Sequence, residues 1–278
     1  MQATALLRLY DYPHPDVPDR RIPGYDRAHA LRTSRMCAAV ALRMGHSTER
    51  VTAYQVACLL HDLGRAGLEP GLFGRIWSWA KSEGIPTRPR EWRAAYPDTR
   101  YGKETEAFIA RHGAQLEKLD IVMNAWTREQ IEMRLGYARR LMRMLRRVKP
   151  RFADLGIEWR PWMLRVVLYY YYPEKLAHAA RWQRELAEIL VACEQFEAYS
   201  NKQRGRDYYV RSRETLREAF AYLEKLQGEG ILSRNVINAL RELAAAGAFD
   251  KLITQARGAA LSKRDIRYLR HCAAGVVL

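Results

Sequence analysis

The sequence has no long apolar run. Its most apolar stretch, residues 162–172, contains Arg165 and is much shorter than the roughly 20 residues that a transmembrane helix needs. Residues 1–20 contain only a short apolar run and lack the basic start of a signal peptide. These absences lead us to expect a soluble protein of the cytoplasm.

Cysteine is scarce and scattered. The four cysteines stand at positions 37, 58, 193 and 272, and no two of them form a CxxC pair. This spacing argues against a zinc ribbon or a dithiol redox motif. The first three fall in helical patterns, where a cysteine is usually a buried free thiol. Free thiols agree with a reducing compartment.

Strand patterns, internal repeats and low-complexity segments are also missing. Apolar residues instead recur every three or four positions over most of the chain, which is typical of amphipathic helices. We therefore predict an all-α bundle. It comprises an extended, proline-rich N-terminal segment at 1–25, a helical domain at 26–250 with a protruding insertion at about 116–160, and a C-terminal helix at 251–278 that packs on the domain.

Acidic residues are outnumbered by basic ones. The chain has 47 Lys and Arg against 31 Asp and Glu, and its formal net charge is +16 at pH 7. Such an excess favours an anionic partner, for example a nucleotide, a nucleic acid or an acidic lipid surface. The charge alone does not distinguish among these partners.

The stretch from Tyr25 to Leu68 predicts two helices joined by a short turn. His29 falls in the first turn of the first helix, and His61 and Asp62 fall at the end of the second. Because a short connection favours antiparallel packing, we expect these three side chains to meet at one end of the pair. The residues that delimit the helices are Asp26, Gly45, Ser47 or Thr48, and Gly64.

Imidazole and carboxylate groups brought together from separate helices can hold a divalent metal ion. Such an ion would polarise a phosphoryl oxygen and lower the pKa of bound water. A His-Asp pair is, however, common by chance in a chain with seven histidines. The pair therefore needs support from the rest of the sequence.

That support comes from a resemblance. His29, followed thirty-two positions later by the text HDLGR at 61–65, resembles the signature of the HD superfamily of metal-dependent phosphohydrolases. The branch that it most resembles is HD-GYP. Residues 189–198 (ILVACEQFEA) are similar to the segment that supplies a late aspartate ligand in that branch, and residues 201–208 and 216–240 resemble the text and helices that follow. The resemblance implies an HD-like helical bundle, here with an inserted basic helical hairpin.

The resemblance also implies roles for single residues. The metal ligands would be His29, His61, Asp62 and, in place of the aspartate, Glu194. Asp62 and Arg65 would take part in catalysis, because Arg65 stands where the family has a lysine and would stabilise charge on the phosphoryl oxygens. The residues that bind the substrate would be Arg65, Tyr171, Arg204 and Arg206. The ion would be Mn²⁺, Fe²⁺ or Mg²⁺.

Several departures from the HD-GYP pattern reduce the expected metal content. Tyr25 stands where the branch has a glutamate, and the place of its third histidine falls near Tyr96 and Pro97. The GYP text is missing, and residues 170–174 (YYYPE) occupy its place. A phenol is a poor ligand for a hard dication compared with imidazole or carboxylate. We therefore expect a single ion rather than two or three.

Residues 119–150 form the most distinctive departure. Ile131, Leu135, Ala138, Met142 and Leu145 repeat at spacings of four and three, which predicts one apolar seam. The remaining surface would carry Arg139, Arg140, Arg143, Arg146 and Arg147. Part of this cluster has a structural reason, because cations stabilise a helix C-terminus. The cluster is either a solvated face or a surface that binds nucleic acid, a membrane or an acidic protein.

Two classes of function remain open. The first is a metal-dependent phosphohydrolase or phosphodiesterase that acts on a nucleotide or another phosphate ester. The second is a catalytically degenerate HD-GYP-like module that binds a cyclic dinucleotide, a nucleic acid or a protein partner in regulation or signalling. The retained residues His29, His61 and Asp62 favour the first class, and the loss of the later histidines favours the second. The oligomeric state stays open.

Overall fold

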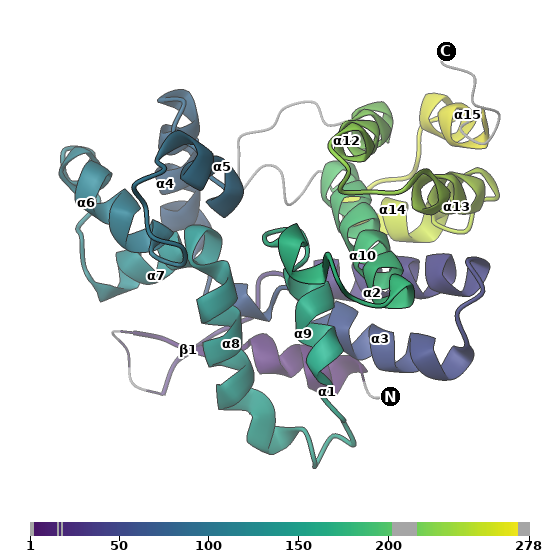
Figure 1. The fold of residues 1–278 in the computed structure, drawn as a ribbon, viewed down its shortest axis with the longest axis horizontal. Helices are drawn as coiled ribbons and strands as arrows, with labels where there is room; N and C mark the ends of the chain where they lie inside the picture. The colour runs from purple at the N-terminus through teal and green to yellow at the C-terminus, as the bar shows by residue number, and fades with distance from the viewer. Residues whose placement is uncertain (1–2, 16, 18, 202–215, 272–278) are drawn as a thin grey trace. The chain divides into compact units, whose positions relative to one another are not determined.

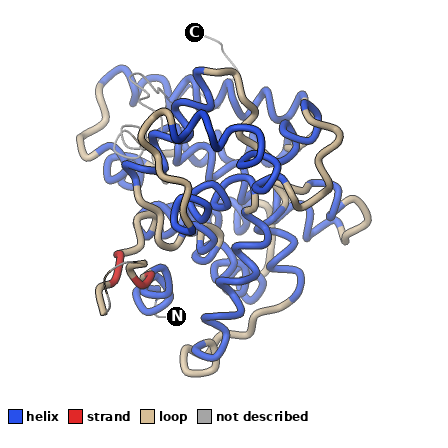
Figure 2. Tube along the Cα trace, turned by 90° about the vertical axis from the view of Figure 1, so that its left-hand side faces the viewer, coloured by secondary structure: helices blue, strands red, loops and turns tan. Residues whose placement is uncertain are grey.

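The computed structural model describes residues 3–15, 17, 19–201 and 216–271. Helices dominate this part of the chain, and its only strands are two of two residues each (Figure 2). The predicted all-α bundle is confirmed. The chain divides into two compact units. The described residues of the first unit lie in 3–27 and 62–156, and those of the second lie in 28–61, 157–201 and 216–271.

The N-terminal segment corrects one prediction, because it is not extended throughout. It begins with α1 (Ala3–Leu7) and a 3₁₀ turn, η1 (Arg8–Tyr10), which bury Leu6, Leu9 and Tyr10. The prolines that suggested an extended chain come only after this helical part. They accompany a small antiparallel ladder of β1 (Tyr12–Pro13) and β2 (Arg21–Ile22).

The remainder of the first unit is built from short helices. They are η2 (Leu63–Arg65), α4 (Pro70–Ser82), α5 (Pro89–Ala95), α6 (Glu104–Glu117), α7 (Ala125–Leu135), α8 (Tyr137–Val148) and η3 (Lys149–Arg151). Both α4 and α5 begin with a proline, whose fixed φ suits the first turn and whose missing N–H is not needed there. Their apolar faces enclose a core that includes Trp77, Trp92, Phe108 and Ile131.

The region of the predicted basic hairpin forms two successive helices, α7 and α8, and the apolar seam predicted along it is not continuous. The two helices meet at Gly136, where a Cβ atom would lie only 2.6 Å from Thr105 Oγ1 and 2.5 Å from Glu132 Cγ. Because this break shifts the helical phase, α8 buries Leu141 and Met144, whereas Met142 is exposed. The assignment of Met142 to the seam was therefore wrong.

The second unit packs its helices around α10 (Arg181–Ser200), which contacts α9 (Pro161–Leu168), α12 (Leu216–Gly228), α13 (Arg234–Ala245) and α14 (Asp250–Arg257) (Figure 1). A 3₁₀ turn, η4 (Pro173–Leu176), precedes α10. The C-terminal part holds α14 and α15 (Lys263–His271) rather than one helix. They are separate because Gly258 adopts the left-handed conformation (φ 65°) that ends α14.

Two further helices of the second unit carry the histidines singled out by the sequence. They are α2 (Arg27–Arg43) and α3 (Thr48–Leu60). Ser47, one of the two caps that the sequence allowed, caps α3 by accepting a hydrogen bond from the backbone N–H of Arg50. His29 lies in the first turn of α2, and His61 is the residue at which α3 ends.

Candidate metal centre

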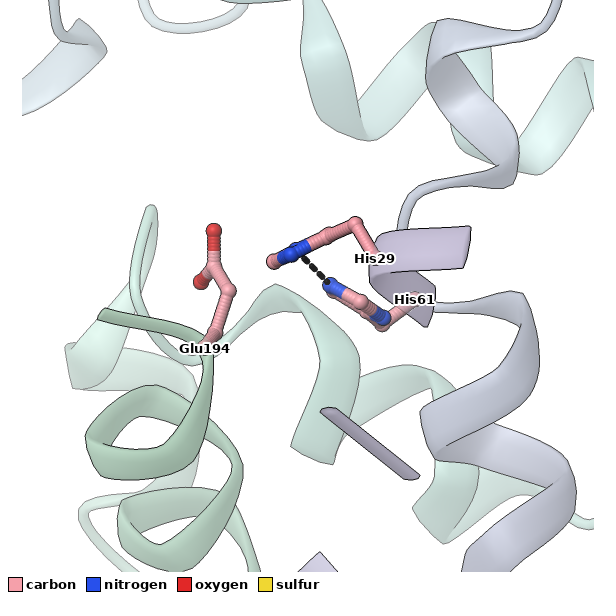
Figure 3. Close-up of side chains that lie close together, drawn as sticks. All are labelled: His29, His61 and Glu194. Atoms are coloured by element: carbon pink, nitrogen blue, oxygen red, sulfur yellow. Dashed lines mark hydrogen bonds between the residues drawn. The ribbon is translucent and has the colours of Figure 1, made fainter. Parts of the chain in front are cut away.

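The structure brings His29 and His61 side by side (Figure 3). Their Nε2 atoms are 3.3 Å apart, and the two side chains are only 2 % and 4 % exposed. This proximity follows from the helix pair, since the start of α2 and the end of α3 lie at the same end of it. The convergence of these two imidazoles agrees with the expectation from their spacing.

The second nitrogen of each imidazole is held by an acceptor. Nδ1 of His61 lies 2.7 Å from the backbone carbonyl oxygen of Cys58, and Nδ1 of His29 contacts Oε2 of Glu197. A carbonyl or a carboxylate oxygen only accepts, so each Nδ1 carries the hydrogen. In the neutral rings, both Nε2 atoms therefore present lone pairs.

Two lone pairs that face each other repel unless a proton or a cation lies between them. Two nitrogens bound to one tetrahedral ion at about 2.0–2.1 Å lie about 3.3 Å from each other. The separation of the Nε2 atoms of His29 and His61 matches this value. The pair is thus spaced and oriented as two ligands of one metal ion.

Glu194 on α10 supplies the third candidate ligand. One of its carboxylate oxygens and one nitrogen of each histidine all lie within 4.8 Å of one another. The side chain is half-buried and stands beside the histidine pair (Figure 3). The group His29, His61 and Glu194 can therefore hold a metal ion, with two nitrogen donors and one oxygen donor.

Glu197 is a site residue that the sequence reasoning missed. It is fully buried one helical turn after Glu194, and it contacts His29 through Oε2. Its Oε1 accepts hydrogen bonds from Nε of Arg32 at 2.6 Å and from Nδ2 of Asn201 at 3.3 Å. The available signal was helical spacing, because Glu197 lies three residues after Glu194 and Arg32 lies three residues after His29.

Asp62 and Arg65 belong to the first unit. Arg65 donates to Oδ2 of Asp62 at 3.2 Å, and the backbone N–H of Asp62 donates to the Tyr10 hydroxyl at 3.2 Å. Burial, followed by the carboxylates of Asp62 and Asp26, holds the pKa of Tyr10 well above its usual range. The described contacts of Asp62 thus place it in an ion pair, and its role as a ligand stays a prediction.

The predicted substrate residues have different positions. Tyr171 is half-buried, and its ring lies 5.7 Å from that of Tyr170. Tyr169 and Tyr172 are buried, whereas Tyr170 is half-buried like Tyr171. All four tyrosines follow the end of α9 at Leu168, so a turn rather than a helix sets their directions. Arg204 and Arg206 lie outside the described residues.

The predicted anion-binding surface requires a correction at Arg140. This residue is fully buried, and its guanidinium donates to the carbonyl oxygens of Gly64 at 2.8 Å and Ala66 at 2.7 Å. It also pairs with Glu129 at 2.6 Å. Arg140 faces inward because α8 packs on η2. Its charge is compensated within the first unit by Glu129.

Two more arginines of that surface have acidic partners. Arg139 pairs with Glu106 at 2.9 Å, and Arg143 pairs with Glu132. These pairs raise the pKa of each arginine and hold the pKa of Glu106 below its usual range, despite partial burial of that carboxyl. The other two arginines of that surface, Arg146 and Arg147, are exposed, and so are Lys149 and Arg151 just beyond them.

Comparison with protein-family models, with curated proteins and with solved structures finds no match to this chain. Among the described residues, no helix is both long and apolar enough to cross a lipid bilayer. The geometry of the residues themselves, together with the sequence motifs, therefore carries what can be inferred about function.

Proposed function

We propose that this protein is a metal-dependent phosphohydrolase that uses a single ion held by His29, His61 and Glu194. The observation that carries the proposal is the pair of facing Nε2 atoms, whose rings are both fixed through Nδ1. Two histidines and one glutamate leave a coordination position open in a tetrahedral site, and this is typical of catalytic rather than structural sites. The resemblance of the HDLGR motif to metal-dependent phosphohydrolases supports phosphate chemistry.

The bound ion would polarise a phosphoryl oxygen and lower the pKa of a water molecule. The chain itself binds the ion through His29, His61 and Glu194, and the excess of basic residues attracts an anionic substrate. The resemblance adds Asp62 as a further ligand and Arg65 as a group that stabilises negative charge on phosphate. These two roles rest on the sequence motif.

The donor set bears on the identity of the ion. Imidazole suits Fe, Zn and related transition ions, whereas Mg²⁺ prefers oxygen ligands. Two of the three donors are nitrogens. Among the ions expected from the resemblance, Fe²⁺ and Mn²⁺ therefore fit better than Mg²⁺, and Zn²⁺ belongs in the same test.

The test combines metal content with hydrolysis. We expect the purified chain to carry a single divalent ion, measured by mass spectrometry, and to hydrolyse bis(p-nitrophenyl) phosphate with added Mn²⁺. The variant His61→Ala should lose both properties. The matched control is His178→Ala, which removes an exposed histidine of the same unit. A chain that binds no divalent ion, or one that hydrolyses the ester equally well after His61→Ala, would refute the proposal.

A second candidate function is binding of a nucleic-acid backbone by the end of α8. Arg146, Arg147, Lys149 and Arg151 are exposed, and within the described part of the chain none of them forms an ion pair. The buried apolar residues between and after them, Val148 and Phe152, leave little apolar surface for insertion into a membrane. Four cations within six positions suit phosphate groups along a strand.

This second candidate makes a separate prediction. A fluorescent single-stranded oligonucleotide should bind with an affinity that falls steeply as salt rises. Replacing the four exposed cations by glutamine should abolish binding, whereas replacing the ion-paired Arg139 and Arg143 should leave it nearly unchanged. Binding should also survive His61→Ala. Binding that is insensitive to salt would argue against this function.

A further inference from the structure

We infer that Glu197 is a positioning residue of the metal centre, which fixes the tautomer and the orientation of His29. This inference rests on the proposed metal centre and assigns a role to a residue outside its ligand set. Glu197 touches His29 rather than the place of the ion. Its action is therefore exerted through the imidazole.

The contacts of Glu197 occupy both ends of its carboxylate. Oε2 accepts from Nδ1 of His29, and Oε1 accepts from Arg32 at 2.6 Å and from Asn201 at 3.3 Å. All of these groups lie in the second unit, on α2 and at or just after the end of α10. The carboxylate is thus surrounded by donors.

The surrounding donors explain how a carboxylate is accommodated at this buried position. Glu197 is fully buried, and an isolated carboxylate would be very unfavourable there. The guanidinium of Arg32 compensates the charge, because it reaches Oε1 of Glu197. The side chain of Arg32 is itself only 11 % exposed. A charge-assisted hydrogen bond of this kind is stronger than a neutral one. Arg32 therefore holds Glu197 as a pure acceptor.

A pure acceptor at Nδ1 decides which nitrogen of His29 can bind a metal. The hydrogen must lie on Nδ1, so Nε2 carries the lone pair and faces the Nε2 atom of His61. His61 is held in the same tautomer by the backbone carbonyl of Cys58, which no side-chain substitution removes. Of the two histidines, only His29 depends on a side chain for this purpose.

The same contacts separate the roles of the two glutamates of α10. Oε2 of Glu197 meets the Nδ1 side of the His29 ring, whereas the facing Nε2 atoms lie on the other side. Glu194, one turn earlier, has its carboxylate oxygen within 4.8 Å of the candidate ligand atoms of both histidines. Glu194 is thus the ligand, and Glu197 orients a ligand.

The substitution Glu197→Gln tests this role with almost no change of shape. An amide offers one acceptor and one donor, whereas both ends of Glu197 face donors. Either Arg32 loses its partner or His29 must move its hydrogen to Nε2. Removing such an outer partner of a metal-bound histidine commonly lowers metal affinity by about 10–100-fold. We expect a loss of this size for Zn²⁺ or Mn²⁺ in a competition titration with a chromogenic chelator.

The matched control is Glu188→Gln on the same helix. Glu188 is also buried, and it accepts from Nε of Arg184 at 3.1 Å and from the backbone N–H of Ser233 at 2.9 Å. Its substitution removes a comparable buried charge without touching the histidine pair. Metal affinity should be unchanged in this variant. An equal loss of affinity in both variants would overturn the assignment, because the effect would then be general to α10.

A second measurement reads the tautomer of His29 directly. Nitrogen-15 NMR of the metal-free protein distinguishes the two histidine tautomers, and signals of His29 are assigned by comparison with His29→Gln. We expect wild-type His29 to carry its hydrogen on Nδ1 and the Glu197→Gln protein to shift it toward Nε2. Wild-type His29 with its hydrogen on Nε2 would overturn the role of Glu197.

The outcomes separate this inference from the function on which it rests. A wild-type chain that binds no divalent ion would remove the metal centre, and the positioning role with it. A wild-type chain that binds the ion as tightly as its Glu197→Gln variant would keep the metal centre and remove only the role of Glu197. The expected result is tight binding by wild type and weakened binding by Glu197→Gln alone.

Discussion

At the scale of single residues, the second unit shows how backbone and side-chain acceptors prepare two imidazoles. His61 is fixed by the carbonyl of its own helix end, so its orientation follows directly from α3. His29 is fixed by Glu197, which stands 168 positions later in the chain. Only the first of these contacts is local. The second requires α2 and α10 to be packed correctly before the site exists.

The cysteines near this site give a prediction at the same scale. Cys37, Cys58 and Cys193 are free and fully buried, and burial raises the pKa of Cys58 and Cys193 well above its ordinary value. Both groups are therefore protonated thiols at neutral pH. In a Cys272→Ser background, we expect burial to keep the three thiols from reacting with Ellman's reagent in the folded protein. In denaturant, all three should react rapidly. Fast reaction of the folded protein would show that at least one of the three cysteines becomes accessible to solvent.

At the scale of elements, α8 holds the residues that follow the His-Asp pair in sequence through one side chain, Arg140. Arg140 reaches from α8 to two carbonyl oxygens of the chain at 64–66 and to Glu129 on α7. Its guanidinium also lies 5.3 Å from the centre of the Tyr12 ring. A residue that the sequence placed in a basic surface thus ties together three elements of the first unit.

Removal of the Arg140 side chain should lower the stability of the folded protein. Arg140→Ala leaves buried carbonyl groups without their donor, and each such group costs about 1–3 kcal/mol. We expect the free energy of unfolding to fall by about 3 kcal/mol or more, measured by urea denaturation. The control Arg146→Ala removes an exposed arginine of the same helix, and its effect should stay within about 0.5 kcal/mol. Equal effects of the two substitutions would contradict the stabilising role assigned to Arg140.

A pH-dependent prediction belongs to the aromatic cluster of α4, α5 and α6. The ring of His112 lies within 6.0 Å of those of Trp79, Trp92 and Phe108, and burial, assisted by Arg111, lowers the pKa of His112. The unfolded chain therefore binds a proton at a higher pH than the folded chain does. Stability should fall as the pH drops below about 6.5, the ordinary pKa of histidine.

The measurement is the free energy of urea unfolding between pH 5 and pH 7.5. We expect His112→Gln to weaken the loss of stability toward acid, since glutamine takes up no proton. His178→Gln, at an exposed position, should leave the slope as in wild type. An unchanged slope in the His112→Gln protein would mean that other groups cause the acid sensitivity.

At the scale of the whole molecule, the proposed metal centre would link ion binding to stability. An ion that binds only the folded state stabilises it by about 2.7 kcal/mol when its free concentration is a hundred times its Kd. We expect Zn²⁺ or Mn²⁺ to raise the Tm of wild type in a calorimetric scan and to leave that of His61→Ala unchanged. A chelator should reverse the shift. An equal rise of Tm in both proteins would place the bound ion elsewhere.

Several elements of the molecule could be predicted from the sequence. The turn after α2, the Ser47 cap and the end of α3 are local features, and they were enough to bring His29 and His61 to the same end of a helix pair. The all-α architecture also follows from local periodicity. The helical start of the N-terminus was missed, because the prolines beyond Tyr10 outweighed the short apolar run before them.

The sequence by itself determined the helical character of most segments and the meeting of two imidazoles, because both depend on interactions within a few turns of the chain. Only the tertiary structure decided that Glu197 would hold His29 and that Arg140 would be buried among backbone carbonyls instead of lying on the surface. Helical periodicity assigns a side chain to a face of its helix. The identity of the group that meets this face is set by the packing of distant segments, which no local pattern records.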